Sequence, residues 1–358
     1  MRKVSKKATF AVMVEHEKYM RRCLELAALA SGNVSPNPLV GAVAVYENKI
    51  IGEGYHQHFG GPHAEVNAVQ DVLKHEHGAE LLKKAVLYVS LEPCSHFGKT
   101  PPCTELIIRH EIPKVVIGCL DPFDAVNGRG IDQLKEYGVE VIEGVLKEEC
   151  EELNKRFFTR IRHSRPYIIL KWAQTADGYF APADGSQKWI TSPLSRALVH
   201  RWRSEEDAIL VGKNTALADN PKLNVRDWKG RNPKRVVIDR NLTLPSVLHL
   251  FDQTSETIVF NALKTETNDK VKYIAPENFD HYLPQYIAFQ LYLMDIQSLL
   301  IEGGVKTLNL FLNAGLWDEA RIFTGPQIWA DGIKAPVISG HLCDSLQIGS
   351  DKLEIFKK

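Results

Sequence analysis

Gly61-Pro62-His63-Ala64-Glu65 is followed, after a predicted strand, by Leu91-Glu92-Pro93-Cys94 and, after a Gly- and Pro-rich loop, by Pro101-Pro102-Cys103. One imidazole and two thiolates, from His63, Cys94 and Cys103, fill three positions around Zn²⁺ and leave the fourth open, as a catalytic zinc site requires. Glu65 follows the histidine by two residues, where it serves to move protons. Each residue alone is more simply explained as a surface histidine or a core cysteine. The four together, with a proline before each cysteine, predict a metal site.

The helix expected over residues 63–76 restricts where this metal can lie. Residues two apart diverge on a helix face, so the ion must sit off the helix N-terminus, where first-turn side chains converge. The positive end of the helix dipole there favours an anionic Glu65, and helices that begin after Cys94 or Cys103 would help to ionise the thiols. His-x-Glu followed by Pro-Cys and a second Cys is typical of zinc-dependent deaminases that act on nucleobase-like rings.

Length and composition narrow the class of protein. A chain of 358 residues, 44% hydrophobic and 25% charged, predicts a globular protein of two domains. Its 44 basic and 44 acidic residues cancel, which argues against a nucleic-acid partner while leaving room for a local phosphate pocket. The six cysteines do not form a secreted disulfide framework, and no run is long enough for a secretory or membrane-spanning segment. We therefore expect a cytoplasmic protein without a membrane partner.

Hydrophobic patterning predicts an α/β protein with domains at 15–160 and 166–358. In the first, a helix over 16–31, an initial hairpin and alternating strands and helices indicate a three-layer α/β/α sandwich with a mixed sheet. The charged stretch 146–166 is the expected junction. The second domain is a further α/β unit whose helix over 193–203 is capped by Thr191 or Ser192. Residues 262–295 give no clear pattern. The predicted strands are 39–45, 50–55, 85–91, 114–118, 139–142, 167–172, 208–212, 235–239, 257–260 and 298–301.

Backbone chemistry is the informative feature of the second half, which has no metal-ligand cluster in its sequence. Glu302-Gly303-Gly304 joins a strand to a helix, and Gly212-Lys213-Asn214-Thr215 forms a second such junction. Main-chain amides at these glycines can approach a phosphate or a nicotinamide closely. The full G-x-G-x-x-G fingerprint is lacking, so nucleotide binding is predicted without a Rossmann domain.

These motifs identify a family resemblance that runs from about Glu17 to the C-terminus. The chain resembles the bifunctional riboflavin-biosynthesis deaminase–reductases of bacteria, in which a cytidine-deaminase-like domain precedes a dihydrofolate-reductase-like domain. The eight residues between Cys94 and Cys103 exceed the spacing of most zinc deaminases and are typical of the riboflavin branch. The matching stretches include Pro36-Asn37-Pro38-x-Val40-Gly41, His56-x6-His63, Gly98-Lys99-Thr100-Pro101-Pro102-Cys103, Leu170-Lys171-x5-Asp177-Gly178, Trp189-Ile190-Thr191-Ser192 and Asn214-Thr215-x3-Asp219-x-Pro221-x-Leu223-x-Val225-Arg226.

The resemblance implies two consecutive reactions. With one Zn²⁺ per chain, the first domain would deaminate 2,5-diamino-6-ribosylamino-4(3H)-pyrimidinone 5′-phosphate, and Glu65 would carry a proton from water to the ring nitrogen and then to the leaving ammonia. The second would use NADPH to reduce the ribosyl chain, giving 5-amino-6-ribitylaminouracil 5′-phosphate. The resemblance also implies a homo-oligomer, either a dimer or a tetramer. The rival hypotheses are a nucleoside or tRNA deaminase with an unrelated second domain, and a non-catalytic zinc protein, which would have no use for Glu65.

Site residues follow from the resemblance by position. The pyrimidine substrate would contact Asn37, His56, Lys99 and Thr100, and NADPH would contact Ala173, Trp189, Thr191, Thr215, Asp219, Gly303 and Gly304. Arg240 stands where the family often has serine and is expected to bind the adenosine 2′-phosphate. Asp121-Pro122-Phe123-Asp124 replaces the family's usual Asp-Pro-Asn-Pro. The reductase substrate would contact Lys171, Ser186 or Gln187, Arg203, Leu223, Arg226 and Glu302, with both arginines near its phosphate.

Overall fold

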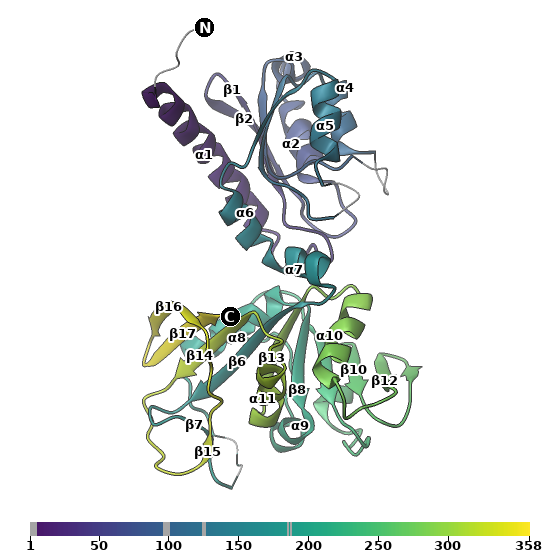
Figure 1. Ribbon diagram of the computed structural model, residues 1–358, viewed down its shortest axis with the longest axis vertical. Coiled ribbons are helices and arrows are strands. Elements are labelled where there is room, and N and C mark those ends of the chain that lie inside the picture. Colours follow the sequence, from purple (N-terminus) through teal and green to yellow (C-terminus); the bar gives the residue numbers. More distant parts are fainter. Residues whose placement is uncertain (1–5, 96–100, 124–126, 185, 187) are drawn as a thin grey trace. The chain divides into compact units, whose positions relative to one another are not determined.

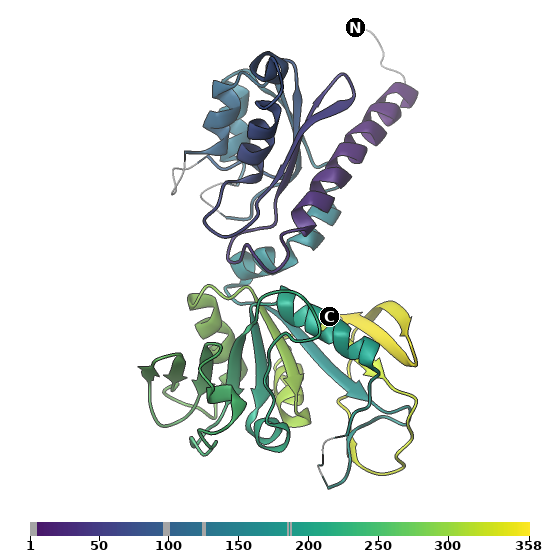
Figure 2. The ribbon, with the colours of Figure 1, turned by 180° about the vertical axis from the view of Figure 1, so that it is seen from behind.

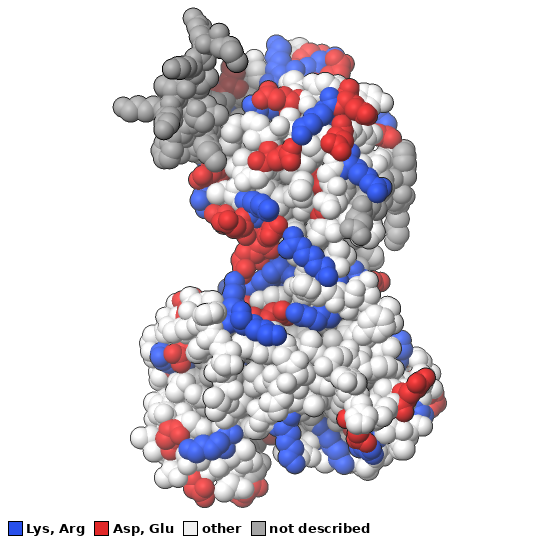
Figure 3. Space-filling model, viewed as in Figure 1, with Lys and Arg blue, Asp and Glu red and all other residues white. Residues whose placement is uncertain are grey.

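Two α/β units make up the chain in the computed structural model, which describes residues 6–95, 101–123, 127–184, 186 and 188–358. The division falls between Arg162 and His163, inside the gap between the domains expected at 15–160 and 166–358. Among the described residues, no helix has the length and apolar character needed to cross a membrane. Basic and acidic side chains are interspersed on the face of each unit shown in Figure 3.

A five-stranded mixed sheet forms the centre of the first unit (Figure 1). Its strand order is β2-β1-β3-β4-β5. β1 pairs antiparallel with β2 and β3, whereas β3, β4 and β5 run parallel. This is the mixed sheet that the sequence predicts. The carboxyl ends of β3 and β4 meet at one edge, next to Cys94. The strands are β1 (Gly41–Tyr46), β2 (Lys49–Tyr55), β3 (Val86–Leu91), β4 (Lys114–Cys119) and β5 (Glu140–Glu143).

Helices cover both faces of this sheet, which confirms the three-layer sandwich. Because strand side chains alternate between faces, Ala42 and Ala44 pack on one side of β1 while Val43 and Val45 pack on the other. The first face is covered by α2 (Ala64–Val72), α3 (Gly78–Leu82), α4 (Cys103–Arg109) and α5 (Arg129–Glu136). The second is covered by α1 (Lys6–Ala28), α6 (Lys147–Leu153) and α7 (Lys155–His163) (Figure 2).

Four helices of the first unit differ from the sequence prediction. α1 begins at Lys6 instead of residue 16. α2 ends at Val72 instead of residue 76, and Gly78 then packs against the carbonyl of Val72. The expected junction 146–166 is largely helical, as α6 and α7 bury Cys150, Phe157 and Phe158.

The second unit is built on a ten-stranded sheet in the order β11-β12-β10-β9-β8-β13-β6-β14-β17-β16. The seven strands from β12 to β14 run parallel and are flanked by antiparallel strands at both edges. A separate two-stranded sheet pairs β7 with β15. The strands are β6 (Tyr167–Gln174), β7 (Tyr179–Ala181), β8 (Ala208–Gly212), β9 (Lys234–Ile238), β10 (Thr257–Phe260), β11 (Glu266–Asn268), β12 (Val271–Ile274), β13 (Ser298–Gly303), β14 (Glu319–Thr324), β15 (Ile333–Lys334), β16 (His341–Ile348) and β17 (Asp351–Lys357).

Helices pack on both faces of the parallel strands. α10 (Leu283–Leu293) and α11 (Val305–Asn313) bury apolar side chains against one face. α8 (Pro193–Glu205), α9 (Lys213–Asp219) and the 3₁₀ turn η1 (His249–Phe251) cover the other. The Ser192 side chain accepts from the Ser195 amide, which confirms the predicted cap of α8. Residues 262–295, which gave no clear pattern, contain β11, β12 and α10.

Candidate functional site

The three predicted metal ligands converge at one edge of the first unit. His63 is the N-cap of α2, Cys94 follows β3, and Cys103 is the first residue of α4. Their donor atoms, His63 Nδ1 and the two Sγ atoms, all lie within 4.8 Å of one another. His63 Nδ1 is 3.6 Å from Cys94 Sγ and 3.3 Å from Cys103 Sγ. The structure therefore gathers one imidazole and two thiols from three separate elements.

This donor set fits zinc in number, type and spacing. Tetrahedral bonds of about 2.3 Å to sulfur and about 2.0–2.1 Å to nitrogen place those atoms roughly 3.6 Å apart. The observed nitrogen–sulfur distances of 3.3 and 3.6 Å are close to that value. Three protein donors also leave a fourth position for water or substrate, as in catalytic rather than structural zinc sites.

The backbone at the start of α2 explains how a histidine and a glutamate two residues apart can face the same point. His63 has extended backbone angles, φ −70° and ψ 164°, so its side chain is not on the helix face. Glu65 occupies the first turn and is 3% exposed. Burial first, and then the charge of the neighbouring Cys94 thiolate, raise the pKa of Glu65 to about 7, so the carboxyl can hold a proton and release it. The donor atoms thus converge off the start of α2, where the helical period places the metal.

The two thiols are inequivalent. A hydrogen bond from the Cys103 thiol lowers the pKa of Cys94, and His63 lowers it further, whereas burial opposes the shift. The backbone amide of Cys103 also donates to Cys94 Sγ over 3.3 Å. The start of α4 therefore supplies both a ligand and a donor that favours the Cys94 thiolate, as expected for a helix that begins at Cys103.

Asn37 and His56 form a short hydrogen-bonded chain that ends beside His63. Nδ1 of His56 lies 2.9 Å from the carbonyl oxygen of Pro62, which can only accept, so Nδ1 carries the proton. Nε2 then accepts from Asn37 Nδ2 over 3.1 Å. His56 is 3% exposed, and its ring centroid lies 5.6 Å from that of His63. These hydrogen bonds fix the orientation of Asn37. The other two expected substrate contacts, Lys99 and Thr100, lie outside the described residues.

In the second unit, Lys171, Arg203 and Glu302 form a buried charged cluster. Arg203 at the end of α8 donates from Nε to Oε1 of Glu302 over 2.8 Å and from Nη2 to Oε2 over 2.7 Å. Burial by itself raises the pKa of Glu302, but the charges of Arg203 and then Lys171 outweigh it and hold that pKa at about 2. Burial lowers the pKa of Lys171. Three predicted substrate residues are thus one electrostatic group.

The Gly303-Gly304 turn meets the start of α9. Gly303 has a φ of +123°, a conformation that side chains disfavour, and Gly304 is the N-cap of α11. A Cβ on Gly304 would lie 2.9 Å from Thr215 Oγ1, and one on Gly303 would lie 3.1 Å from the ring of Phe180. Backbone and hydroxyl donors from two strand–helix junctions are therefore close together. Asp219, whose pKa is raised by burial, ends α9, and Ala173 lies on β6.

Trp189 and Thr191 precede α8 and are held by an arginine that the sequence motifs did not indicate. The Arg196 guanidinium lies 4.9 Å from the centroid of the Trp189 ring, and it donates from Nη1 to the Thr191 carbonyl over 2.8 Å. Trp189 is 65% exposed, so its ring is available to a ligand. No local motif marks Arg196, because its role comes from a cation–π contact across the helix start.

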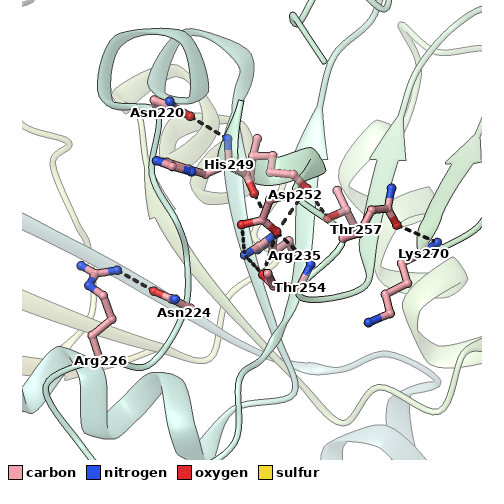
Figure 4. Close-up of polar contacts among 11 residues, drawn as sticks. Asn220, Asn224, Arg226, Arg235, His249, Asp252, Thr254, Thr257 and Lys270 are labelled. Carbon is pink, nitrogen blue, oxygen red and sulfur yellow. Dashed lines mark hydrogen bonds and ion pairs between the residues drawn. The ribbon is translucent and has the colours of Figure 1, made fainter. Parts of the chain in front are cut away.

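Among the remaining expected residues, Arg226 shares a hydrogen-bond partner with the charged cluster, since Nη1 of Arg203 donates to the Asn224 carbonyl. Arg240 is exposed and pairs with Asp280. Arg226 is exposed and donates to Asn224 Oδ1 over 2.6 Å (Figure 4), whereas Leu223 is buried. The Ser186 amide donates to Asp184 Oδ1 over 2.9 Å, and Gln187 is outside the described residues.

The three-layer sandwich, the three metal ligands and the buried Glu65 together define a zinc-dependent deaminase domain. A second α/β domain follows it in the chain. The cytidine and deoxycytidylate deaminase zinc-binding region matches residues 13–119, and the RibD C-terminal domain matches residues 166–347. The chain belongs to the family of riboflavin biosynthesis protein RibD, and it is an enzyme with a deaminase and a reductase domain.

Similarity to this family extends over nearly the whole chain. The RibD protein of Aquifex aeolicus is 41% identical, with 94% of this chain and 95% of the relative covered, and that of Escherichia coli is 37% identical over 88% and 89%. The crystal structure of a diaminohydroxyphosphoribosylaminopyrimidine deaminase/5-amino-6-(5-phosphoribosylamino)uracil reductase from Thermotoga maritima has a TM-score of 0.88 and 38% identity, covering 97% of this chain and 99% of that one.

Proposed function

We propose that the protein catalyses two consecutive steps of riboflavin biosynthesis. The first is deamination of 2,5-diamino-6-ribosylamino-4(3H)-pyrimidinone 5′-phosphate, and the second is reduction of its ribosyl chain to give 5-amino-6-ribitylaminouracil 5′-phosphate. The observation that carries this proposal is a zinc-type ligand triad beside the buried Glu65, in a chain that continues into a RibD C-terminal domain. The match of residues 166–347 to the RibD C-terminal domain disfavours a nucleoside or tRNA deaminase with an unrelated second domain.

In the deaminase, His63, Cys94 and Cys103 would hold the metal. Zinc in such a site lowers the pKa of water towards neutrality. Glu65 would carry one proton from water to the ring nitrogen, which keeps it in the uracil product, and a second proton from the added hydroxyl to the amino group, which leaves as ammonia. This role suits a carboxyl whose pKa lies near 7. Asn37, oriented by His56, holds the pyrimidine, and Lys99 and Thr100 complete the substrate contacts.

In the reductase, NADPH supplies the reducing equivalents, and the protein aligns it with the sugar. The exposed Trp189 ring and the close approach of the Gly303-Gly304 turn to Thr215 support a cofactor site formed by these residues. We assign the cofactor to Ala173, Trp189, Thr191, Thr215, Asp219, Arg240, Gly303 and Gly304. We assign the substrate to Lys171, Ser186, Gln187, Arg203, Leu223, Arg226 and Glu302.

Separate assays of the two half-reactions test this function. Ammonia release from the diaminopyrimidinone phosphate reports the first site, and NADPH oxidation with supplied aminouracil phosphate reports the second. Glu65→Gln should abolish ammonia release and leave NADPH oxidation intact, because only the first site loses its proton carrier. The exposed Glu80→Gln is the matched control and should alter neither rate. Normal deamination by Glu65→Gln would refute the mechanism, and a wild-type protein inert in both assays would refute the function.

We further propose a homo-oligomer, a dimer or a tetramer, in the cytoplasm. The family resemblance supports the first statement, and the six cysteines, all free thiols, support a reducing compartment. Light scattering of the purified protein tests the oligomer, since a molar mass near 40.3 kDa would show a monomer.

A further inference from the structure

His200 is a buried histidine of α8 to which the proposed reactions assign no role. Its side chain is only 4% exposed. The backbone amide of Arg226 donates to His200 Nδ1 over 3.3 Å, and His200 Nε2 lies 3.4 Å from Oδ2 of Asp227. Because a backbone amide can only donate, Nδ1 is unprotonated and the ring proton is on Nε2, facing Asp227. One imidazole thus contacts two consecutive residues of the connection between α9 and β9.

A second side chain from the same face of α8 holds this connection. His200 and Arg203 are three residues apart on the helix, so their side chains lie on one face. Nη1 of Arg203 donates to the carbonyl oxygen of Asn224 over 3.3 Å. The side chain of Asn224 in turn accepts from Nη1 of Arg226 over 2.6 Å (Figure 4). Residues 224–227 are therefore attached to α8 at both ends.

This attachment brings Arg226 next to the buried charged cluster of the second unit. Arg203 binds Glu302 through Nε and Nη2, and Glu302 directly precedes the Gly303-Gly304 turn. The same arginine thus contacts both the cluster and the segment that carries Arg226. The Arg226 side chain is exposed, so its guanidinium is accessible to an anionic ligand beside the cluster.

The surrounding charges keep the His200 imidazole neutral. Burial lowers the pKa of His200, and the charges of Arg203 and then Arg226 lower it further. The carboxylates of Asp227 and Glu302 act in the opposite direction and do not outweigh these effects. A neutral ring leaves Nδ1 able to accept from the Arg226 amide, which an imidazolium could not do. His200 therefore lies within reach of the charges of both arginines and of Glu302.

We propose that His200 is a positioning residue of the reductase, which holds the backbone of Arg226 so that the guanidinium meets the phosphate of the pyrimidine substrate. This proposal rests on the reductase function and on the assignment of Arg226 to the substrate, both proposed above. Because His200 acts through the Arg226 amide, its loss should weaken substrate binding and leave the hydride transfer intact. The expected defect is therefore in the Michaelis constant for the aminouracil phosphate.

His200→Leu and His200→Asn form a matched pair of variants. Leucine fills the space but offers no acceptor to the Arg226 amide, whereas the asparagine amide oxygen takes the place of Nδ1. For His200→Leu we expect the KM for aminouracil phosphate to rise about tenfold, with kcat changed less than about threefold. His200→Asn should bring that KM back to within about threefold of wild type. The KM for NADPH and the rate of ammonia release should be unchanged in both, and His341→Leu, at an exposed histidine, should behave as wild type.

A double-mutant cycle shows whether His200 acts through Arg226. Arg226→Ala should itself raise the KM for aminouracil phosphate about tenfold or more. Adding His200→Leu to Arg226→Ala should raise it no further, because no guanidinium remains to be positioned. A residue that only stabilised the fold would instead impair the double variant by the product of the two single effects.

Asp227→Ala tests the same contact without altering the core, because Asp227 is exposed and is the partner of Nε2. It should raise the KM about threefold. An unchanged KM in both His200→Leu and Asp227→Ala would overturn the proposal, and so would multiplicative effects in the double variant or no recovery with His200→Asn. Wild-type protein that oxidises no NADPH with aminouracil phosphate would instead refute the proposed function, which keeps the two failures distinct.

Discussion

Replacing Glu302 by glutamine removes one charge from the buried cluster of the second unit. The Glu302 and Arg203 side chains are 9% and 12% exposed, and they form two hydrogen bonds of 2.7 and 2.8 Å. The shift of the Glu302 pKa from 4.5 to about 2 corresponds to about 3 kcal/mol in favour of the charged form. Removing one partner of a buried ion pair typically costs about 3–5 kcal/mol. We therefore expect Glu302→Gln to lower the free energy of unfolding by about 3 kcal/mol.

Tryptophan fluorescence during urea unfolding isolates this unit, because all six tryptophans of the chain belong to it: Trp172, Trp189, Trp202, Trp228, Trp317 and Trp329. The matched control is Glu266→Gln, which breaks an ion pair with Lys264 in which both side chains are 42% exposed. Exposed pairs of this kind contribute little, so the control should unfold like wild type. If Glu302→Gln were no more destabilising than this control, the reasoning about the buried cluster would be wrong.

Acid should reduce the difference between wild type and Glu302→Gln. The folded pKa lies below the unfolded value, so the charged carboxylate stabilises the fold above about pH 4.5, and that stability is lost as the pH falls towards 2. The difference in unfolding free energy should stay constant from neutral pH to about pH 5 and then shrink by about 1.4 kcal/mol per pH unit. A difference that grows on acidification would contradict the assigned sign.

Three further predictions concern the metal, a buried ion pair and the cofactor turn. Chelation should abolish ammonia release but not NADPH oxidation, and about one equivalent of zinc should restore it; deamination that survives in metal-free protein would exclude the assigned site. Asp252→Asn should cost about 3 kcal/mol in the urea assay, because Arg235 is fully buried and Asp252 is its charged partner (Figure 4); an unchanged midpoint would show that the Thr254 and backbone contacts suffice. Gly303→Ala should weaken NADPH binding, measured by titration, and cost about 1–3 kcal/mol through its φ of +123°, with normal ammonia release as its control.

The zinc triad could be predicted because its signal is local. His63, Cys94 and Cys103 each stand at the end of a strand or the start of a helix, and such boundaries are marked in the sequence by prolines and by changes of period. Parallel strands then bring these boundaries to one edge. Even the place of the metal, off the start of α2, followed from the helical period. The family resemblance was needed to choose the substrate and the residues that contact it.

Long-range contacts could not be predicted in the same way. Glu92 receives its donors from Asp121, Gly128 and Gly130, and no motif states that the connection after β4 folds back on β3. The boundary between the units falls inside the predicted junction 146–166, but the charges of this stretch hide the few apolar positions that α6 and α7 bury, so the two helices could not be predicted. In both cases tertiary packing, and not local propensity, decides the outcome.

Arg203 and Arg226, which are both expected near the substrate phosphate, differ in how their charges are balanced in the structure. Nε and Nη2 of Arg203 are occupied by Glu302, and Nη1 donates to the Asn224 carbonyl over 3.3 Å, so its charge is largely balanced inside the protein. Arg226 is exposed, and its guanidinium donates to the neutral side chain of Asn224. An incoming phosphate would have to compete with a buried carboxylate for Arg203 but not for Arg226. We therefore propose two roles for these residues: Arg226 supplies the charge that attracts the phosphate, and Arg203 holds the carboxylate of Glu302 in place.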